Sequence, residues 1–189
     1  MVRLKSLLLL PLILFSLFIY IVSDTFVYAH LFDCAGSEAI ASGVYAEKIK
    51  TARKLFTKPL DFPEPEYYVK STQCYNAWSL GTEKVIVSES VIQNFTPEEL
   101  AGILSHELAH TRTHIQNEYP SHWEIDVMGA RLTSKKIMLK KLVRMLNEYD
   151  NLYEDNKLLM YAFPFSYSTY IAIRNDYLFR IDMVNTYLK

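Results

Sequence analysis

The stretch LSHELAHTRTHIQNEYPSHWEIDVMGARL, from Leu104 to Leu132, holds most of the histidines of this 189-residue chain. They are His106, His110, His114 and His122. His106 and His110 enclose the pattern H-E-x-x-H, in which two histidines are four residues apart. Positions i and i+4 of a helix project from the same face, so both imidazoles can reach one ion. The stretch therefore predicts a helix that carries part of a metal site.

The residue types in this pattern are those that zinc chemistry uses. Zinc prefers tetrahedral nitrogen and oxygen ligands at ~2.0–2.2 Å, and His106 and His110 supply two nitrogens. Glu107 is rotated by roughly 100° from His106 on a helix, which leaves its carboxylate beside the ion as a base. The helix is well specified, because Thr96-Pro97-Glu98-Glu99 offers an N-cap, a proline at the first position and a capping box.

The H-E-x-x-H pattern alone does not identify the third ligand of the metal. The extended motif of the metzincins would need glycine and histidine where this chain has Thr113 and Gln116, which excludes that class. Of the nearby candidates, His114 is one turn too far along the same helix, and Glu118 falls in the connecting turn. The candidates are His114, Glu118, His122 and Glu124.

Three segments resemble the M48-type gluzincin metallopeptidases and their minimal relatives, the minigluzincins. These segments are NAW after an expected strand, VIVSESVIQNFTPEELAGILSHELAH, and HWEIDVMGARL. The resemblance extends roughly over residues 67–189. It implies an α+β, mainly helical, zincin-like domain, with a small antiparallel β-hairpin packed on the active-site helix. It also implies a Zn²⁺ cofactor and a polypeptide substrate.

In that family a zinc-binding glutamate precedes an aspartate by four residues, and small residues follow. On this chain the aspartate is Asp126 and the small residue is Gly129, which puts His122 at the ligand position. His122 and Asp126 share one helix face, so Asp126 can hydrogen-bond a liganding imidazole. Glu124 is the alternative third ligand, although it is about 200° around the helix from His122 and also fits a capping box with Ser121.

A second departure from the family lies near the C-terminus. The family has a His-Pro pair whose histidine precedes an Arg-Ile pair by six residues, and this chain has Arg174 and Asn175 before Arg180-Ile181. The resemblance implies that Arg174 can donate to the developing oxyanion. The alternative is an ordinary surface arginine, and Tyr167 and Tyr170 are further donor candidates.

A small sheet is expected before the histidine cluster. Residues 67–80 are typical of a strand, Gly81 marks a turn, and residues 84–88 are typical of a second strand. Together they predict an antiparallel hairpin. Its first strand matches the substrate-side edge strand of the resembling family, so it could pair with an extended polypeptide.

Helices are expected on both sides of this sheet. Apolar residues recur with helical period over residues 37–58. Ser121 is expected to start a helix that continues through Leu142. Apolar and aromatic-rich helices fill the remainder, with a break at Pro164.

The amino end is a separate segment. Arg3 and Lys5 precede the apolar run Leu7–Val22, and no further Lys or Arg occurs before Lys48. This bias places the amino end in the cytoplasm and the rest of the chain across the membrane. As a helix the run spans about 24 Å, short for a ~30 Å hydrocarbon core. A signal peptide cleaved near Ala29 therefore competes with a retained anchor over residues 7–22.

The chain is thus expected to have two parts, a signal peptide or membrane anchor (1–29) and a metallopeptidase domain (30–189). We expect an exported, periplasmic or otherwise extracytoplasmic protein. Cys34 and Cys74 are compatible with one disulfide in such a compartment, and equally with two unrelated thiols. A net charge of −1 and the lack of a basic patch argue against nucleic acid as a partner.

These features predict a zinc-dependent endopeptidase of the cell envelope, with Glu107 as general base for a metal-activated water. The alternative is an exported zinc-binding module, chaperone-like or used in assembly, without proteolytic activity. The unusual third ligand favours that alternative, and Glu107 argues against it, because a purely structural site needs no base. The expected partners are a polypeptide substrate and, if the amino end is retained, the membrane.

Overall fold

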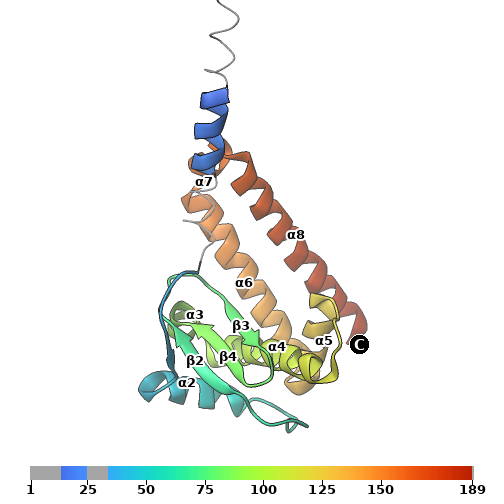
Figure 1. Cartoon of the computed structure of the whole chain (residues 1–189). Coiled ribbons are helices and arrows are strands. Elements are labelled where there is room, and N and C mark those ends of the chain that lie inside the picture. Colours follow the sequence, from blue (N-terminus) through green and yellow to red (C-terminus); the bar gives the residue numbers. More distant parts are fainter. Residues whose placement is uncertain (1–13, 25–33, 189) are drawn as a thin grey trace, which may run out of the picture.

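The computed structural model describes residues 14–24 and 34–188, and this part of the chain is mainly helical with one small sheet (Figure 1). The strands are β1 (Glu38–Ile40), β2 (Glu66–Lys70), β3 (Ala77–Leu80) and β4 (Lys84–Ser88). The helices are α2 (Gly43–Arg53), α3 (Glu89–Asn94), α4 (Pro97–Gln116), α5 (His122–Leu132), α6 (Lys135–Asp155), α7 (Lys157–Ala162) and α8 (Pro164–Tyr187). A further helix covers residues 14–24. The expected α+β, mainly helical class is confirmed.

Among the described residues, four strands form a mixed sheet in the order β1-β2-β4-β3. β4 is antiparallel to β3, with a turn at Gly81, whose φ of 64° favours glycine. The antiparallel pairing expected there is present. The predicted single strand over residues 67–80 is wrong, because residues 71–76 leave the sheet and β4 pairs in parallel with β2. β3 is consequently an edge strand, separated from β2 by β4.

The helix predicted over residues 37–58 is shorter than expected. Residues 38–40 form β1 instead, antiparallel to β2, and Glu38 forms ion pairs with Lys70 and Lys84. These cross-strand contacts favour an extended backbone over a helix at this position. The helix begins at Gly43, where φ is 55°.

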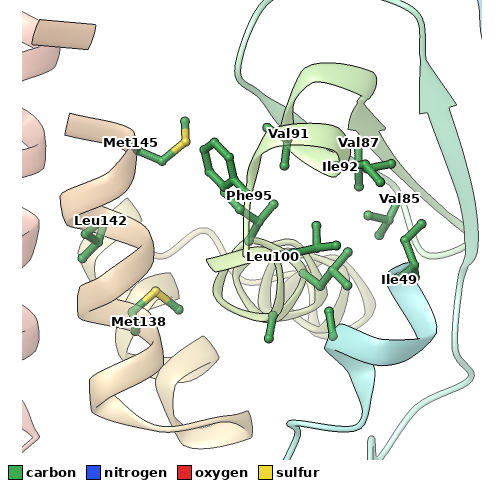
Figure 2. Close-up of a cluster of buried hydrophobic side chains, with 14 of the residues drawn as sticks. Ile49, Val85, Val87, Val91, Ile92, Phe95, Leu100, Met138, Leu142 and Met145 are labelled. Atoms are coloured by element: carbon green, nitrogen blue, oxygen red, sulfur yellow. The ribbon is translucent and has the colours of Figure 1, made fainter. Parts of the chain in front are cut away.

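The core lies between the sheet and the helices, and Figure 2 shows side chains from α2, β4, α3, α4 and α6 meeting in one cluster. Fully buried side chains of this size contribute roughly 1.5–3 kcal/mol each. The cluster therefore fixes α4 against the sheet. Its labelled members are Ile49, Val85, Val87, Val91, Ile92, Phe95, Leu100, Met138, Leu142 and Met145.

Helix α4 has the expected capping box. The Thr96 backbone N–H donates to the Glu99 carboxylate at 2.8 Å, and the Glu99 N–H donates to the Thr96 hydroxyl at 3.3 Å. The helix ends at Gln116, followed by Asn117 in a left-handed conformation. The predicted start of this helix is confirmed.

Two glycines allow helices to approach α4 closely. A Cβ atom on Gly129 of α5 would lie 2.9 Å from the Ser105 carbonyl oxygen of α4. A Cβ atom on Gly102 of α4 would lie 2.5 Å from the Cβ of Lys141 on α6. Larger side chains would clash at both positions, so these glycines set the distances at which α5 and α6 pack on α4.

The helix predicted from Ser121 through Leu142 is wrong in its length, because it ends at Leu132. The Thr133 hydroxyl donates to the Gly129 carbonyl at 3.2 Å, and the Ser134 hydroxyl accepts from the Ile137 N–H at 3.2 Å. Both hydroxyls satisfy backbone groups at helix ends, which favours two helices over one continuous helix.

Helices α6 and α8 lie side by side and form a helical arm (residues 135–187) that extends away from the sheet (Figure 1). The predicted break at Pro164 is confirmed, because α7 ends at Ala162 and α8 begins at Pro164. The far end of the arm contains α7, and the helix of residues 14–24, which is blue in Figure 1, lies beside it.

Only part of the predicted apolar amino-terminal run is described. Residues 14–22 of that run are helical, whereas residues 7–13 and the expected cleavage near Ala29 lie outside the described residues. Within residues 14–24 and 34–188, no helix combines the length and the apolar character that crossing a membrane requires.

Cys34 and Cys74 form a disulfide across 40 residues of sequence, with their Cα atoms 5.4 Å apart. Of the two alternatives, the bonded pair is the one present. The bond fastens the segment before β1 to the segment between β2 and β3.

Candidate active site

His106 and His110 lie one turn apart on α4, with ring centroids separated by 4.8 Å. The helix is buried along this stretch, and only 6% of His106 is exposed. The buried neighbours Ser105, Leu108 and Ala109 hold the helix against the core, so the histidine-bearing face turns towards β3 and α5. The predicted arrangement of two imidazoles on one helix face is present.

His122, the first residue of α5, brings a third imidazole to this pair. Its ring centroid lies 5.9 Å from that of His106 and 5.6 Å from that of His110. Imidazoles bound to one tetrahedral zinc through nitrogens at ~2.0–2.1 Å have ring centroids roughly 5 Å apart. The side chains are near that arrangement. In the part of the chain that the structure describes, however, no three His, Cys, Asp or Glu side chains are gathered closely enough to form a finished metal site.

Asp126 orients the His106 ring. Its Oδ1 lies 2.7 Å from His106 Nδ1, and the carboxylate is fully buried. Because an ionised carboxylate only accepts hydrogen bonds, Nδ1 carries the proton and Nε2 keeps its lone pair for a ligand. Asp126 lies one turn after His122 on α5, so the packing of α5 on α4 places both residues next to His106.

Two cations also contact Asp126. Lys141 Nζ of α6 lies 3.2 Å from Oδ1, and Arg180 of α8 donates from Nε to Oδ2 at 2.6 Å and from Nη2 to Oδ1 at 3.1 Å. Burial by itself would raise the pKa of Asp126, but Lys141, His106 and Arg180 hold it well below its usual range. The carboxylate is therefore ionised, and it ties α4, α5, α6 and α8 together.

The three imidazoles are held in their neutral form. Burial lowers the pKa of His106 well below its ordinary value. Burial and the neighbouring His122 lower the pKa of His110 to about 4, and burial followed by Arg180 lowers that of His122. A neutral imidazole is the form that binds a metal ion, so these side chains fit such a ligand near pH 7.

Glu107 is buried beside the histidines, with 7% of the residue exposed. Burial raises the pKa of its carboxyl to about 7, although Lys141 and a backbone hydrogen bond from Ser79 lower it. A carboxyl group with a pKa near neutrality can both accept and return a proton. This property is typical of an acid–base group in a catalytic site.

A cavity of about 440 Å³ opens over these residues. Its walls come from the edge strand β3, helices α4 and α5, and the arm helices α6 and α8. Two other described hollows, of about 190 and 370 Å³, have α2 residues in their lining and no histidine. The cavity is lined by Asn76, Ala77, Trp78, Ser79, Leu80, Ile103, His106, Glu107, His110, His114, His122, Lys141, Met145, Tyr177 and Arg180.

Of the other candidate ligands and donors, Glu124 and Arg174 lie outside the cavity lining, and His114 lies on its wall. The Glu124 carboxylate accepts from the Ser121 backbone N–H at 2.8 Å, which is its predicted cap position. Exposed His114 lies on the cavity wall, one turn beyond His110. Arg174 does not line the cavity, because its Nε donates to Asp150 of α6 at 3.2 Å.

Sequence reasoning missed Lys141, Tyr177 and the contact of Arg180 with Asp126. Lys141 is 3% exposed and Arg180 is 5% exposed. Lys141 lies on the same helix face as the buried Met138, Leu142 and Met145. A lysine within such an apolar stripe indicates a buried cation with a partner, and this signal could have identified Lys141 from the sequence. For Arg180, the signal was the match of Arg180-Ile181 to the Arg-Ile pair of the resembling family, which by itself does not show the contact with Asp126.

Edge strand β3 lies against α4 at the cavity. The Ser79 hydroxyl and the Thr111 hydroxyl are 2.9 Å apart, and the strand residues 77–80 line the cavity. Within residues 14–24 and 34–188, β3 pairs with β4 on one side only. Its second edge can therefore accept another extended strand alongside the histidines and Glu107.

Comparison with known families adds to this geometry. Residues 46–120 match the model of peptidase family M48, a family of zinc metallopeptidases. No solved structure matches the chain. The matched segment includes β3, β4 and α4 with His106, Glu107 and His110, and it ends just before His122. The resemblance to M48-type metallopeptidases that the sequence predicted is confirmed over residues 46–120.

Proposed function

We propose that this protein is a zinc-dependent endopeptidase. The observation that carries the proposal is the convergence of three neutral imidazoles, from two helices, beside one buried glutamate in a cavity. His106, His110 and His122 would hold the zinc ion, and Asp126 would orient His106. Bound there, zinc supplies a Lewis acid that polarises a peptide carbonyl and acidifies a water molecule.

Glu107 would act as the general base. Its carboxylate takes a proton from the attacking water and returns it to the leaving amine, which requires a pKa close to the working pH. The raised pKa of Glu107 supports this role. Asp126, Lys141 and Arg180 contribute by holding α4 and α5 in position.

The substrate would be an extended polypeptide. The free edge of β3 borders the cavity, so main-chain hydrogen bonds could align a substrate strand past Glu107. Flexible or unfolded segments suit this mode, because folded segments have their backbone groups already paired. We also propose an extracytoplasmic location in the cell envelope, supported by the charge bias of the amino end and by the Cys34–Cys74 disulfide.

A second candidate is an exported zinc-binding module without proteolytic activity. The observation that favours it is histidine at position 122, where the resembling family has glutamate, together with the position of Arg174 outside the cavity. Buried Glu107 argues against it, because a module that only binds metal gains nothing from a buried acid–base group.

Cleavage of casein by the zinc-loaded protein tests the proposal. Wild-type protein should cleave casein, and Glu107→Gln should lose about 10²–10⁴-fold in rate. Glu107→Gln should retain zinc at the wild-type ratio. Zinc binding without cleavage in the wild type would favour the second candidate, and unchanged cleavage by Glu107→Gln would refute the proposed base.

A further inference from the structure

The far end of the helical arm has no charged side chains over a long stretch. Residues 158–173, which cover α7 and the beginning of α8, contain no Asp, Glu, Lys or Arg. Several large apolar or aromatic side chains are exposed there. Leu158 is 87% exposed, Tyr161 is 58% exposed and Phe165 is 54% exposed. Such exposed clusters on a protein mark a surface that is covered by something else.

The helix of residues 14–24 lies next to this end and is also apolar and exposed (Figure 1). Its large apolar side chains at 14–22 are all between 41% and 64% exposed. The exposed surface is thus continuous between two parts of the chain that are far apart in sequence. We call residues 14–22 and 158–165 together the apolar tip.

Asp24 joins the two parts of the apolar tip. It is 7% exposed, and its carboxylate accepts from the Phe165 N–H at 3.0 Å, the Ser166 N–H at 3.3 Å and the Ser166 hydroxyl at 3.0 Å. The first residue of α8, Pro164, has no N–H, and Phe163 at the N-cap provides no side-chain acceptor. Asp24 therefore caps α8 from a different segment of the chain.

Tyr20 makes a second connection. Its ring stacks on Phe163 with centroids 5.9 Å apart, and its hydroxyl donates to the Ala162 carbonyl at 3.2 Å. That carbonyl is at the end of α7, where intrahelical donors are missing. Both connections satisfy helix-end groups of the arm, so the helix of residues 14–24 is built into the fold.

We propose that the apolar tip is retained in the mature protein and docks the chain on a lipid bilayer. Charged side chains are absent from the exposed face over residues 158–165, and tyrosines border it, as is typical of segments at a membrane interface. The tip is also continuous with the apolar amino-terminal run.

Fluorescent labelling of the full-length chain tests this proposal. Leu158→Cys carries an environment-sensitive NBD label on its thiol, and Val44→Cys on α2 is the matched control. Val44 is 65% exposed, and its helix α2 lies at the opposite end of the molecule from α7 (Figure 1). Cys34 and Cys74 are bonded to each other, so only the new thiol reacts. Vesicles of phosphatidylcholine and phosphatidylglycerol should raise the emission at position 158 several-fold and shift it to the blue, with no change at position 44.

Three outcomes would overturn the proposal. If the chain floats with vesicles while the label at 158 responds no more than the label at 44, lipid contact is confined to the amino end. A blue shift at 158 that depends on protein concentration and needs no vesicles would assign the surface to a second copy of the chain. A mature protein whose mass lacks residues 1–29 would show that the tip is not retained.

The role of Asp24 is tested separately with the same label. Asp24→Asn should reduce the vesicle response at position 158 by about half or more, because the two parts of the tip lose their connection. Asp155→Asn at the end of α6 is the control and should leave the response unchanged. An unchanged response in Asp24→Asn would show that the two parts do not act as one surface.

Discussion

The Nδ1 atom of His106 lies 2.7 Å from the Oδ1 atom of Asp126, and both groups are buried. This single contact connects the histidine helix α4 to α5, which carries His122. Lys141 and Arg180 meet the same carboxylate from α6 and α8. The proposed metal site and the packing of four helices therefore depend on one side chain.

Asp126→Asn should weaken zinc binding and stability together. The amide cannot match a carboxylate as an acceptor for His106, which typically lowers metal affinity by about 10–100-fold. It also leaves two buried cations without a counter-charge, at about 3–5 kcal/mol. Competition with a zinc chelator and urea unfolding measure the two effects. Asp176→Asn, a more exposed partner of Arg180, is the control, and unchanged zinc affinity in Asp126→Asn would contradict this role.

The choice of third ligand predicts different results at two neighbouring positions. His122→Ala should lose stoichiometric zinc, because its ring is the one near His106 and His110. Glu124→Ala should keep zinc and lose about 1 kcal/mol from the missing helix cap. Metal analysis of both purified variants decides between them, and the reverse pattern would make Glu124 the ligand.

The two arginines of α8 should differ in their effects. Arg174→Ala should change kcat/KM for a peptide substrate by less than about twofold, since this side chain pairs with Asp150 away from the cavity. Arg180→Ala should destabilise the protein, because Asp126 would lose its closest cation. Kinetics and thermal unfolding of both variants test this, and a large loss of kcat in Arg174→Ala would restore the oxyanion role expected from the sequence.

Gly129→Ala should disturb the approach of α5 to α4. The new methyl group would lie 2.9 Å from the Ser105 carbonyl oxygen, and overpacking of this kind costs about 1–3 kcal/mol. Because α5 carries His122, zinc affinity should fall as well. Val91→Ala, a core change on α3, is the control that destabilises without moving α5. Equal zinc affinities in the two variants would contradict the proposed coupling.

Removal of the disulfide should lower stability without affecting zinc. For the closed loop of 40 residues, the chain-entropy estimate is about 4 kcal/mol. The Cys34→Ser/Cys74→Ser variant should therefore unfold at lower urea concentration, while its zinc content stays at the wild-type ratio. A loss of zinc would mean that the segment between β2 and β3 helps to position the site.

The features that the sequence predicted correctly depend on local spacing. The Thr96 cap, the two histidines one turn apart and the helix break at Pro164 all follow from residues close together in the chain. His122 lies near His106, with ring centroids 5.9 Å apart, and its role as third ligand stays a prediction that rests on a family resemblance. The cap, the histidine spacing and the proline break are local features, so they can be predicted without the tertiary structure.

The features that were wrong or missed depend on contacts between distant segments. Residues 71–76 leave the sheet because β4 pairs with β2 and the Cys34–Cys74 bond fastens the segment, and neither contact is visible in the local pattern. Lys141 gains its role only because Gly102 brings α6 onto α4. The break after Leu132 is an exception, because its hydrogen bonds are local: the Thr133 hydroxyl donates to the Gly129 carbonyl, and the Ser134 hydroxyl accepts from the Ile137 N–H.

The length of α6 has a consequence for what the protein could cut. Its 21 residues span about 31 Å, and the helices that carry the histidines, α4 and α5, pack near the end opposite to α7 (Figure 1). The cavity meets α6 at Lys141 and Met145, and the part of the helix from there to Asp155 spans about 15–21 Å. With α7 resting on lipid, the scissile bond would be held roughly that far into the aqueous phase. Ectodomains and secreted chains could be reached there, while segments embedded in the bilayer would stay out of range.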